Sequence, residues 1–283
     1  MSDDWLSVEI GGLTFAIQVD SPLTIAPIAT LYEAFCVEID AEWQVRVHVD
    51  ATLRDDMPPQ VRHDGNVTYF RTMSHQGWVD LDKRWAEVST PSQERIHSAL
   101  VRVLSYIIMQ VLPRRGEGLL VHGAGVLIQE RAHLFFGASG RGKSTVAGLA
   151  RRVGRVLTDE NVIIRKSVAG FRLYSTPFWG LSTPASDIHS IGRADAPLVA
   201  LYALEHSPNF ELERLSQGRA TMALLTSEKV ATERNTSAEA WLEMVSEIVK
   251  QVPTYRLGFR PTSELWHFLA EQGCFIPETP PKS

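Results

Sequence analysis

Nine consecutive residues carry the groups that bind the phosphates of a nucleotide. Three glycines give the backbone room to approach a phosphate, a lysine supplies positive charge and a serine supplies a hydroxyl. The pattern GxxxxGK[ST], the P-loop or Walker A sequence, is met without a mismatch by Gly137, Ala138, Ser139, Gly140, Arg141, Gly142, Lys143, Ser144 and Thr145. Because the N–H groups of such a loop point at phosphate oxygens, the sequence predicts a nucleotide-binding site.

The residues on either side of this loop favour the same interpretation. The apolar run 133–136 is typical of a buried strand, and 146–153 is typical of a helix closed by Gly154. Strand, loop and helix form the context that the motif requires, whereas a chance glycine-rich turn would lack it. We therefore expect Lys143 to neutralise the β- and γ-phosphates of ATP and the Ser144 hydroxyl to complete the shell of a Mg²⁺ ion.

Two adjacent carboxylates are the next candidates. Asp159 and Glu160 follow a predicted strand at 155–158, the first strand after the loop helix. Ligands of α/β sheets collect at the carboxyl ends of strands, so these carboxylates are expected to face the nucleotide. One would orient or deprotonate an acceptor hydroxyl and the other would serve the metal. The alternative is an ordinary surface pair that ends a strand.

His122 lies inside the apolar run 119–128. A histidine in such a place is commonly a satisfied core residue, but this one could also reach a phosphate or orient a carboxylate. His48, His63 and His75 share no metal-binding spacing. Four arginines are candidates for a cation that stabilises the transition state, and nothing in their spacing selects one. They are Arg193, Arg214, Arg256 and Arg260.

The elements that position these residues point to a mixed sheet. The runs 119–128 and 133–136 are too close for a parallel crossover, which needs about a dozen residues, so they are predicted to form an antiparallel hairpin. The runs 162–165 and 171–174 predict a second hairpin. A capping pattern at 236–239 predicts a helix that reaches residue 251. This is an α/β fold whose sheet is mixed or antiparallel.

Residues 1–90 are predicted to form an accessory, β-rich α+β domain. Alternating apolar residues at 13–19 and 43–49 indicate strands, and 25–35 is expected to be a helix. A hairpin signal at 64–65 leads into a strand at 67–70, and 78–81 is a further short strand. Residues 91–283 are assigned to a P-loop domain that includes a linking helix over 91–112, whose first turn is predicted to be capped by the pattern at 90–93. We expect the first domain to serve substrate docking or contacts in a homo-oligomer.

Composition excludes several classes of protein. The chain has 283 residues, 44% hydrophobic and 22% charged, as in ordinary soluble globular proteins. The net charge is −5 and the basic residues are scattered, so the sequence lacks the clustered positive charge typical of nucleic-acid-binding proteins. The N-terminus lacks the apolar core of a signal peptide, and no run reaches the ~20 apolar residues of a membrane span. A cytoplasmic protein is expected.

Three segments resemble the core of the HPr serine kinase/phosphorylase family, which belongs to the phosphoenolpyruvate carboxykinase-like kinases. They are 121–127, 136–145 and 156–162. The likeness is closest to HPr-kinase-related proteins that accompany peptide-modification genes, including lasso-peptide precursor kinases, and 176–180 and 255–259 share it. The resemblance covers roughly residues 116–262.

This resemblance implies roles for individual residues. Asp159 falls where the family has its catalytic aspartate, which acts as a base toward a serine hydroxyl. Glu160 stands where the family has a second aspartate that serves the metal, and its side chain is longer by one methylene. His122 matches a histidine near the phosphates. The chain lacks an obvious counterpart of the segment associated with the phosphorylase reaction, so the forward kinase reaction is the one implied.

The sequence thus predicts a transferase that uses ATP and Mg²⁺ to phosphorylate a hydroxyl, with a serine of a protein or peptide as the expected acceptor. Two alternatives stay open. One is a small-molecule kinase of the shikimate or gluconate type, which would have a parallel sheet. The other is a nucleotide-gated binding module without turnover, which would show no acceptor-dependent consumption of ATP.

Overall fold

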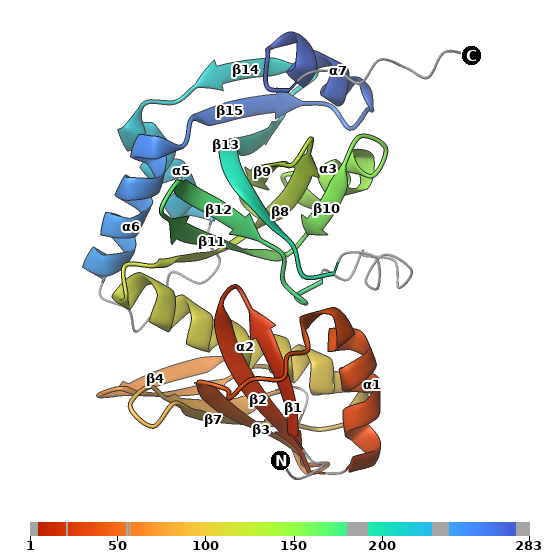
Figure 1. Ribbon diagram of the computed structural model, residues 1–283, viewed down its shortest axis with the longest axis vertical. Helices are drawn as coiled ribbons and strands as arrows, with labels where there is room; N and C mark the ends of the chain where they lie inside the picture. Colours follow the sequence, from red (N-terminus) through yellow and green to blue (C-terminus); the bar gives the residue numbers. More distant parts are fainter. Residues whose placement is uncertain are drawn as a thin grey trace.

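A computed structural model of the chain describes residues 5–20, 22–54, 56, 58–179, 192–227 and 238–275. Within these residues the protein is a mixed α/β structure of two mixed sheets and six α-helices (Figure 1). The strands of the first sheet lie before residue 91, and those of the second lie after residue 117. The predicted mixed α/β class is confirmed at this level.

The first sheet has seven strands in the order β1-β2-β3-β7-β6-β5-β4. They are β1 (Trp5–Ile10), β2 (Leu13–Val19), β3 (Trp43–Val49), β4 (Gln60–Asp64), β5 (Val67–Arg71), β6 (Gln76–Asp80) and β7 (Trp85–Thr90). The pairs β2–β3 and β3–β7 are parallel, and the other pairs are antiparallel. Strands β1 and β7 were not predicted from the sequence.

Two helices cover the same face of this sheet. α1 (Pro22–Tyr32) with the short 3₁₀ turn Glu33–Phe35, and α2 (Ile96–Arg114), share one core with the apolar side chains of the strands. The alternation in β2 shows which side is buried, because Leu13, Phe15, Ile17 and Val19 are all buried while their neighbours are partly exposed. The residues between them, which are more polar, point to the opposite face of the sheet.

Helix α2 lies between the two sheets (Figure 1). The core in which this helix packs also contains Leu120 of β8, Ile163 of β11 and Phe178, all from the part of the chain that follows the helix. In the part of the chain that the structure describes, the segment Gln93–Arg114 is the one helix long and apolar enough to cross a membrane, but 72% of its apolar window is buried inside the protein. Burial of each large apolar side chain stabilises the fold by about 1.5–3 kcal/mol. The helix therefore packs as a core element of this protein.

The start of this helix differs from the prediction. The sequence suggested a helix from residue 91 with a capped first turn, but Thr90 ends strand β7 and is buried. A 3₁₀ turn at Gln93–Arg95 follows, in which Ser92 makes no side-chain cap. α2 itself begins at Ile96 and continues through Pro113. Pairing of β7 with two neighbouring strands therefore outweighed the local capping signal.

The second sheet has eight strands. They are β8 (Gly118–Ile128), β9 (Arg131–Phe136), β10 (Arg155–Thr158), β11 (Asn161–Ser167), β12 (Gly170–Tyr174), β13 (Asp195–His206), β14 (Glu211–Arg214) and β15 (Thr254–Phe259). Both predicted hairpins are confirmed, since β8 pairs antiparallel with β9 and β11 with β12. Two pairs are parallel, β9 with β13 and β13 with β15.

These pairings put four strand ends at one edge of the sheet. β9 and β10 both run antiparallel to β8, and β13 and β15 run parallel to β9. The carboxyl ends of β9, β10, β13 and β15 therefore point the same way. The remaining helices are α3 (Lys143–Ala150), α5 (Gln217–Ser227), α6 (Ala238–Gln251) and α7 (Glu264–Glu271). The capping residues predicted before α6 lie outside the described residues, apart from Ala238, which begins the helix.

The β1–β2 turn and strand β1 of the first sheet make polar contacts with residues of the second half of the structure. The guanidinium of Arg165 on β11 donates hydrogen bonds to the carbonyl of Gly11 (2.5 Å) and to the carboxylate of Glu117 (2.9 Å). Arg193 pairs with Glu9 on β1 at 2.9 Å. The β1–β2 turn thereby reaches the strand that begins directly after Glu160.

Candidate functional site

The predicted phosphate loop connects β9 to α3 and needs its glycines. Gly140 and Gly142 have φ angles of 80° and 93°, in the left-handed region that favours glycine. A Cβ atom on Gly142 would lie 2.6 Å from Cζ of Phe259, a buried ring at the end of β15. The carbonyl of Gly142 accepts a hydrogen bond from the N–H of Val146 (2.9 Å), which starts the helix. The loop conformation is therefore fixed by backbone geometry.

Lys143 is buried at the first position of α3, with 7% of its surface exposed. Its ammonium donates hydrogen bonds to the carbonyls of Gly137 (2.8 Å) and Ala138 (3.1 Å). The side chain thus folds back over the loop, and the positive charge is held among backbone groups. An ammonium has three donors, so it can exchange such carbonyls for phosphate oxygens.

Two further residues brace the loop, and the sequence did not indicate either of them. His206 ends β13 and Phe259 ends β15, and the two rings stack with centroids 6.1 Å apart. Nε2 of His206 lies 2.7 Å from the carbonyl oxygen of Gly140. With its proton on Nε2, the imidazole donates to that carbonyl. Only the parallel pairing of β13 with β9 and β15 brings these residues to the loop, and no local pattern encodes it.

The two predicted carboxylates follow β10 and lie at the same edge as the loop. Asp159 is buried, with 5% of its surface exposed. The preceding residue, Thr158, is anchored by a hydrogen bond from its hydroxyl to the carbonyl of Phe178 (2.9 Å). The carbonyl of Glu160 accepts a hydrogen bond from the N–H of Gly123 on β8 (3.0 Å). Both carboxylates therefore stand on a fixed backbone.

His122 lies beside this pair. It is 6% exposed and sits opposite Asn161 in the register of β8 and β11. Its Nδ1 is 3.4 Å from Oε1 of Glu160, whose side chain is 38% exposed. The structure thus brings His122 and Glu160 together, and the histidine can orient that carboxylate.

The donors at this edge suit Mg²⁺ delivered with a nucleotide. Among the described residues, no three His, Cys, Asp or Glu side chains converge on a point where they would hold a metal by themselves. Mg²⁺ characteristically keeps waters and binds through one or two carboxylates together with substrate phosphates. The Ser144 hydroxyl, in the first turn of α3, and the Glu160 carboxylate fit that requirement by their chemistry.

Three of the four candidate arginines have carboxylate partners. Arg193 pairs with Glu9, and Arg260 pairs with Glu264 at 2.6 Å. Arg256 contacts the carboxylates of Glu205, Glu211 and Glu213. These pairs are partly exposed and individually weak. The structure does not single out one arginine as the cation of a reaction.

The chain is similar to a known protein family. A family model described as the SynChlorMet cassette protein ScmC matches residues 85–271, more than half of the chain. The matched region contains the phosphate loop, both carboxylates, His122 and the two bracing rings. No curated protein matches the chain.

Proposed function

The chain belongs to the family of the SynChlorMet cassette protein ScmC, and we propose that it is a kinase that uses ATP and Mg²⁺ to phosphorylate a hydroxyl group. The acceptor is a serine of a protein or peptide. One observation carries the proposal: the glycine loop with its buried lysine and the Asp159–Glu160 pair stand at the same edge of one sheet. Phosphate binding alone needs only the loop, whereas transfer also needs groups for the metal and the acceptor.

Lys143 and the loop amides bind the phosphates in this proposal. The Lys143 ammonium exchanges its bonds to Gly137 and Ala138 for oxygens of the β- and γ-phosphates. Ser144 and Glu160 would hold a Mg²⁺ ion, which neutralises negative charge on the phosphates when it is bound. His122 keeps the Glu160 carboxylate in place through its Nδ1 contact.

Asp159 acts on the acceptor. The serine oxygen attacks the γ-phosphorus, the bond from phosphorus to the β–γ bridging oxygen breaks, and ADP leaves. The hydroxyl proton passes to the Asp159 carboxylate. Asp159 suits this role because it is buried on a fixed backbone at the end of β10, and only β8 separates that strand from the loop strand β9.

The architecture of the phosphoenolpyruvate carboxykinase-like kinases is part of the proposal. It rests on the resemblance of the three core segments and on the antiparallel partner of the loop strand, β8. A small-molecule kinase of the shikimate or gluconate type is less favoured, because such enzymes have a parallel sheet around the loop. A cytoplasmic location and a homo-oligomer stay predictions.

Acceptor-dependent consumption of ATP tests the proposal against the binding-module alternative. The purified chain is incubated with ATP and Mg²⁺, with and without a panel of serine-containing peptides. We expect ATP consumption to rise when an acceptor peptide is present and to be abolished by Lys143→Ala. Lys166→Ala is the matched control, because Lys166 is a half-exposed lysine paired with Glu247 on another element. ATP binding without acceptor-dependent turnover would favour the binding module instead.

A further inference from the structure

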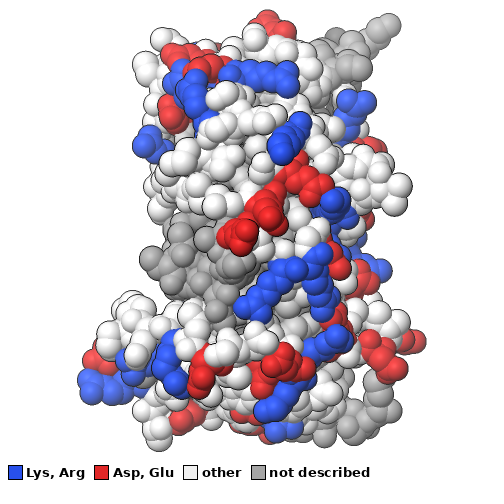
Figure 2. All heavy atoms as spheres, turned by 90° about the vertical axis from the view of Figure 1, so that its left-hand side faces the viewer, with Lys and Arg blue, Asp and Glu red and all other residues white. Residues whose placement is uncertain are grey.

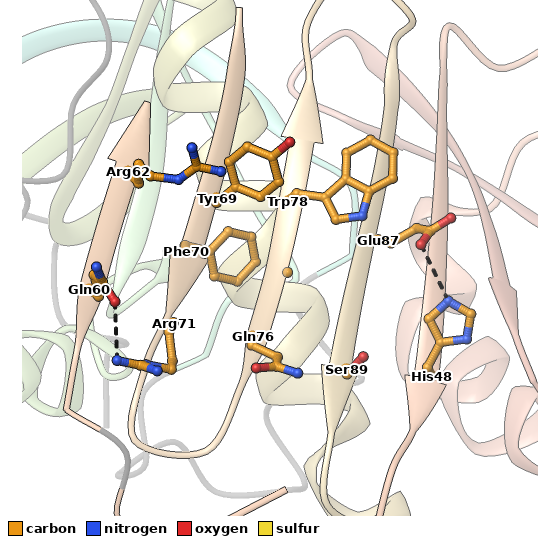
Figure 3. A pocket seen from close by; sticks show the side chains of 11 residues that line it. His48, Gln60, Arg62, Tyr69, Phe70, Arg71, Gln76, Trp78, Glu87 and Ser89 are labelled. Atoms are coloured by element: carbon orange, nitrogen blue, oxygen red, sulfur yellow. Dashed lines mark hydrogen bonds and ion pairs between the residues drawn. The ribbon is translucent and has the colours of Figure 1, made fainter. Parts of the chain in front are cut away.

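The first sheet has an uncovered face with a hollow in it. Helices α1 and α2 both pack on the other face. The hollow has a volume of about 370 Å³ and is lined from five strands, β3 to β7. Figure 3 shows Gln60 and Arg62 at one end of it, Tyr69 and Trp78 in the middle and His48 at the other end. We call this site the outer-face hollow.

One end of the outer-face hollow is positively charged. The Arg71 guanidinium is held by neutral acceptors, the carbonyl of Pro58 (3.2 Å) and the side chain of Gln60 (3.1 Å), and it has no ion pair within the described residues. Arg62 stacks on the ring of Tyr69 at 4.3 Å, and its ion pair with Asp64 is long (3.9 Å) and exposed. Two guanidinium groups are therefore available to a carboxylate.

The rest of the hollow limits what can occupy it. Its own carboxylate, Glu87, accepts a hydrogen bond from Trp85 (3.0 Å) and lies 3.8 Å from His48, at the end opposite the arginines. Trp78 offers an aromatic face between the two ends. An extended polyanion would meet Glu87, so the hollow does not suit nucleic acid. On the side of the molecule that Figure 2 shows, both positive and negative side chains are present.

Its length indicates a peptide rather than a small anion. Five adjacent strands, at about 4.8 Å between neighbours, span roughly 19 Å. An extended peptide covers that distance with about six residues. We propose that the outer-face hollow binds an acidic segment of a peptide, with a carboxylate on Arg62 and Arg71 and an apolar side chain on Trp78. This segment would belong to the peptide that accepts the phosphate, and that part of the proposal rests on the proposed kinase function.

Peptide binding without nucleotide tests the proposal. The probe is a short fluorescein-labelled peptide, Glu-Ser-Glu-Ser-Leu-Ser, in which both glutamates and the leucine lie on one face of the extended chain, and its anisotropy is followed as the full chain is added. We expect saturable binding that is weakened about tenfold by Arg71→Gln and by Arg62→Gln, because each loses a charge-assisted hydrogen bond. Arg54→Gln is the matched control, since Arg54 is exposed, pairs with Asp56 and does not line the hollow.

Several results would overturn the proposal. One is that the acidic peptide does not bind. Another is that both arginine variants melt at the wild-type temperature and bind the peptide as tightly as the wild type does. A third is that a lysine–leucine peptide or an oligouridine RNA binds more tightly than the acidic peptide. Lys143→Ala separates this test from that of the kinase. This variant is expected to bind the acidic peptide as tightly as the wild type does. If it loses phosphate transfer but still binds the peptide, peptide binding by the hollow is supported independently of the kinase proposal.

Discussion

The two candidate sites of this molecule are built in different ways. The edge of the second sheet uses backbone groups at strand ends, with Gly142 and Lys143 packed against buried neighbours. The outer-face hollow uses side chains that project from the middle of strands, such as Arg62 and Trp78. Backbone amides at strand ends have no partners in the sheet and are free to hold a phosphate. A sheet face has its amides paired and recognises a ligand only through side chains.

This difference predicts unequal tolerance to substitution. A change at the edge alters the backbone and the core beneath it, and it is expected to affect folding and binding together. A change in the outer-face hollow removes one contact and leaves the sheet intact. Substitutions at the edge and in the core should therefore alter stability more than Arg62→Gln or Arg71→Gln in the hollow, in the order below from the largest effect to the smallest.

Gly142→Ala is expected to have the largest effect on stability. The new Cβ would be strained at a φ of 93° and would lie 2.6 Å from the buried ring of Phe259. Strain of about 1–3 kcal/mol and overpacking of about 1–3 kcal/mol would add, and ATP binding would be lost. The free energy of unfolding in urea and isothermal titration with ATP measure both quantities.

Two other glycines serve as controls for this prediction. Gly140 also has a positive φ, of 80°, but a Cβ there would meet nothing within 4 Å, so Gly140→Ala should show the strain alone. Gly148 lies within α3 with equally open space, and Gly148→Ala should leave the stability unchanged or raise it by about 0.5–1 kcal/mol. Equal effects at all three positions would contradict the account of the loop.

Acid is expected to destabilise both halves of the molecule. Burial lowers the pKa of His97, in α2, to about 4, and burial together with Arg131 lowers that of His133, on β9, to about 4. The unfolded chain takes up these protons near pH 6.5, so the stabilisation is fully present above that pH and falls between about pH 6.5 and 4. The loss is on the order of 3 kcal/mol for each histidine at most.

Urea unfolding at a series of pH values measures this loss. His97→Gln and His133→Gln should each flatten the dependence on pH. His267→Gln is the matched control, since His267 is exposed on α7. A slope that is the same in the wild type and in both buried variants would contradict the assignment.

Replacement of His206 is expected to have the smallest of these effects. His206→Ala removes the contact to the Gly140 carbonyl and leaves the loop less ordered before ATP binds. We expect KM for ATP to rise about tenfold, as for the loss of one hydrogen bond of about 1.4 kcal/mol, with kcat little changed. His206→Gln retains a donor and should restore much of the affinity. A fall in kcat with KM unchanged would point to a role in the chemical step.

The sequence predicted the parts of the fold that depend on local patterns. The phosphate loop is encoded by nine adjacent residues, and the hairpin of β8 and β9 followed from its short connection. Strands β1 and β7 were not predicted. β1 shows only a short alternation of Leu6, Val8 and Ile10, and β7 ends at Thr90, where the sequence also fits a helix cap.

What could not be predicted depends on contacts between distant segments. The parallel pairing of β9 with β13 joins residues more than sixty positions apart, and it brings His206 to the loop. The outer-face hollow combines side chains from His48 to Ser89, on five strands whose order in the sheet differs from their order in the chain. Their alternation indicated strands but not which strands are neighbours.

The most direct test of the kinase proposal is the mass of an acceptor peptide after incubation with ATP and Mg²⁺. The wild type should add one phosphoryl group to a serine of the peptide. Asp159→Asn should bind ATP normally yet transfer phosphate at least about 100-fold more slowly, because the proton acceptor is lost. Transfer at the wild-type rate by Asp159→Asn would contradict the account.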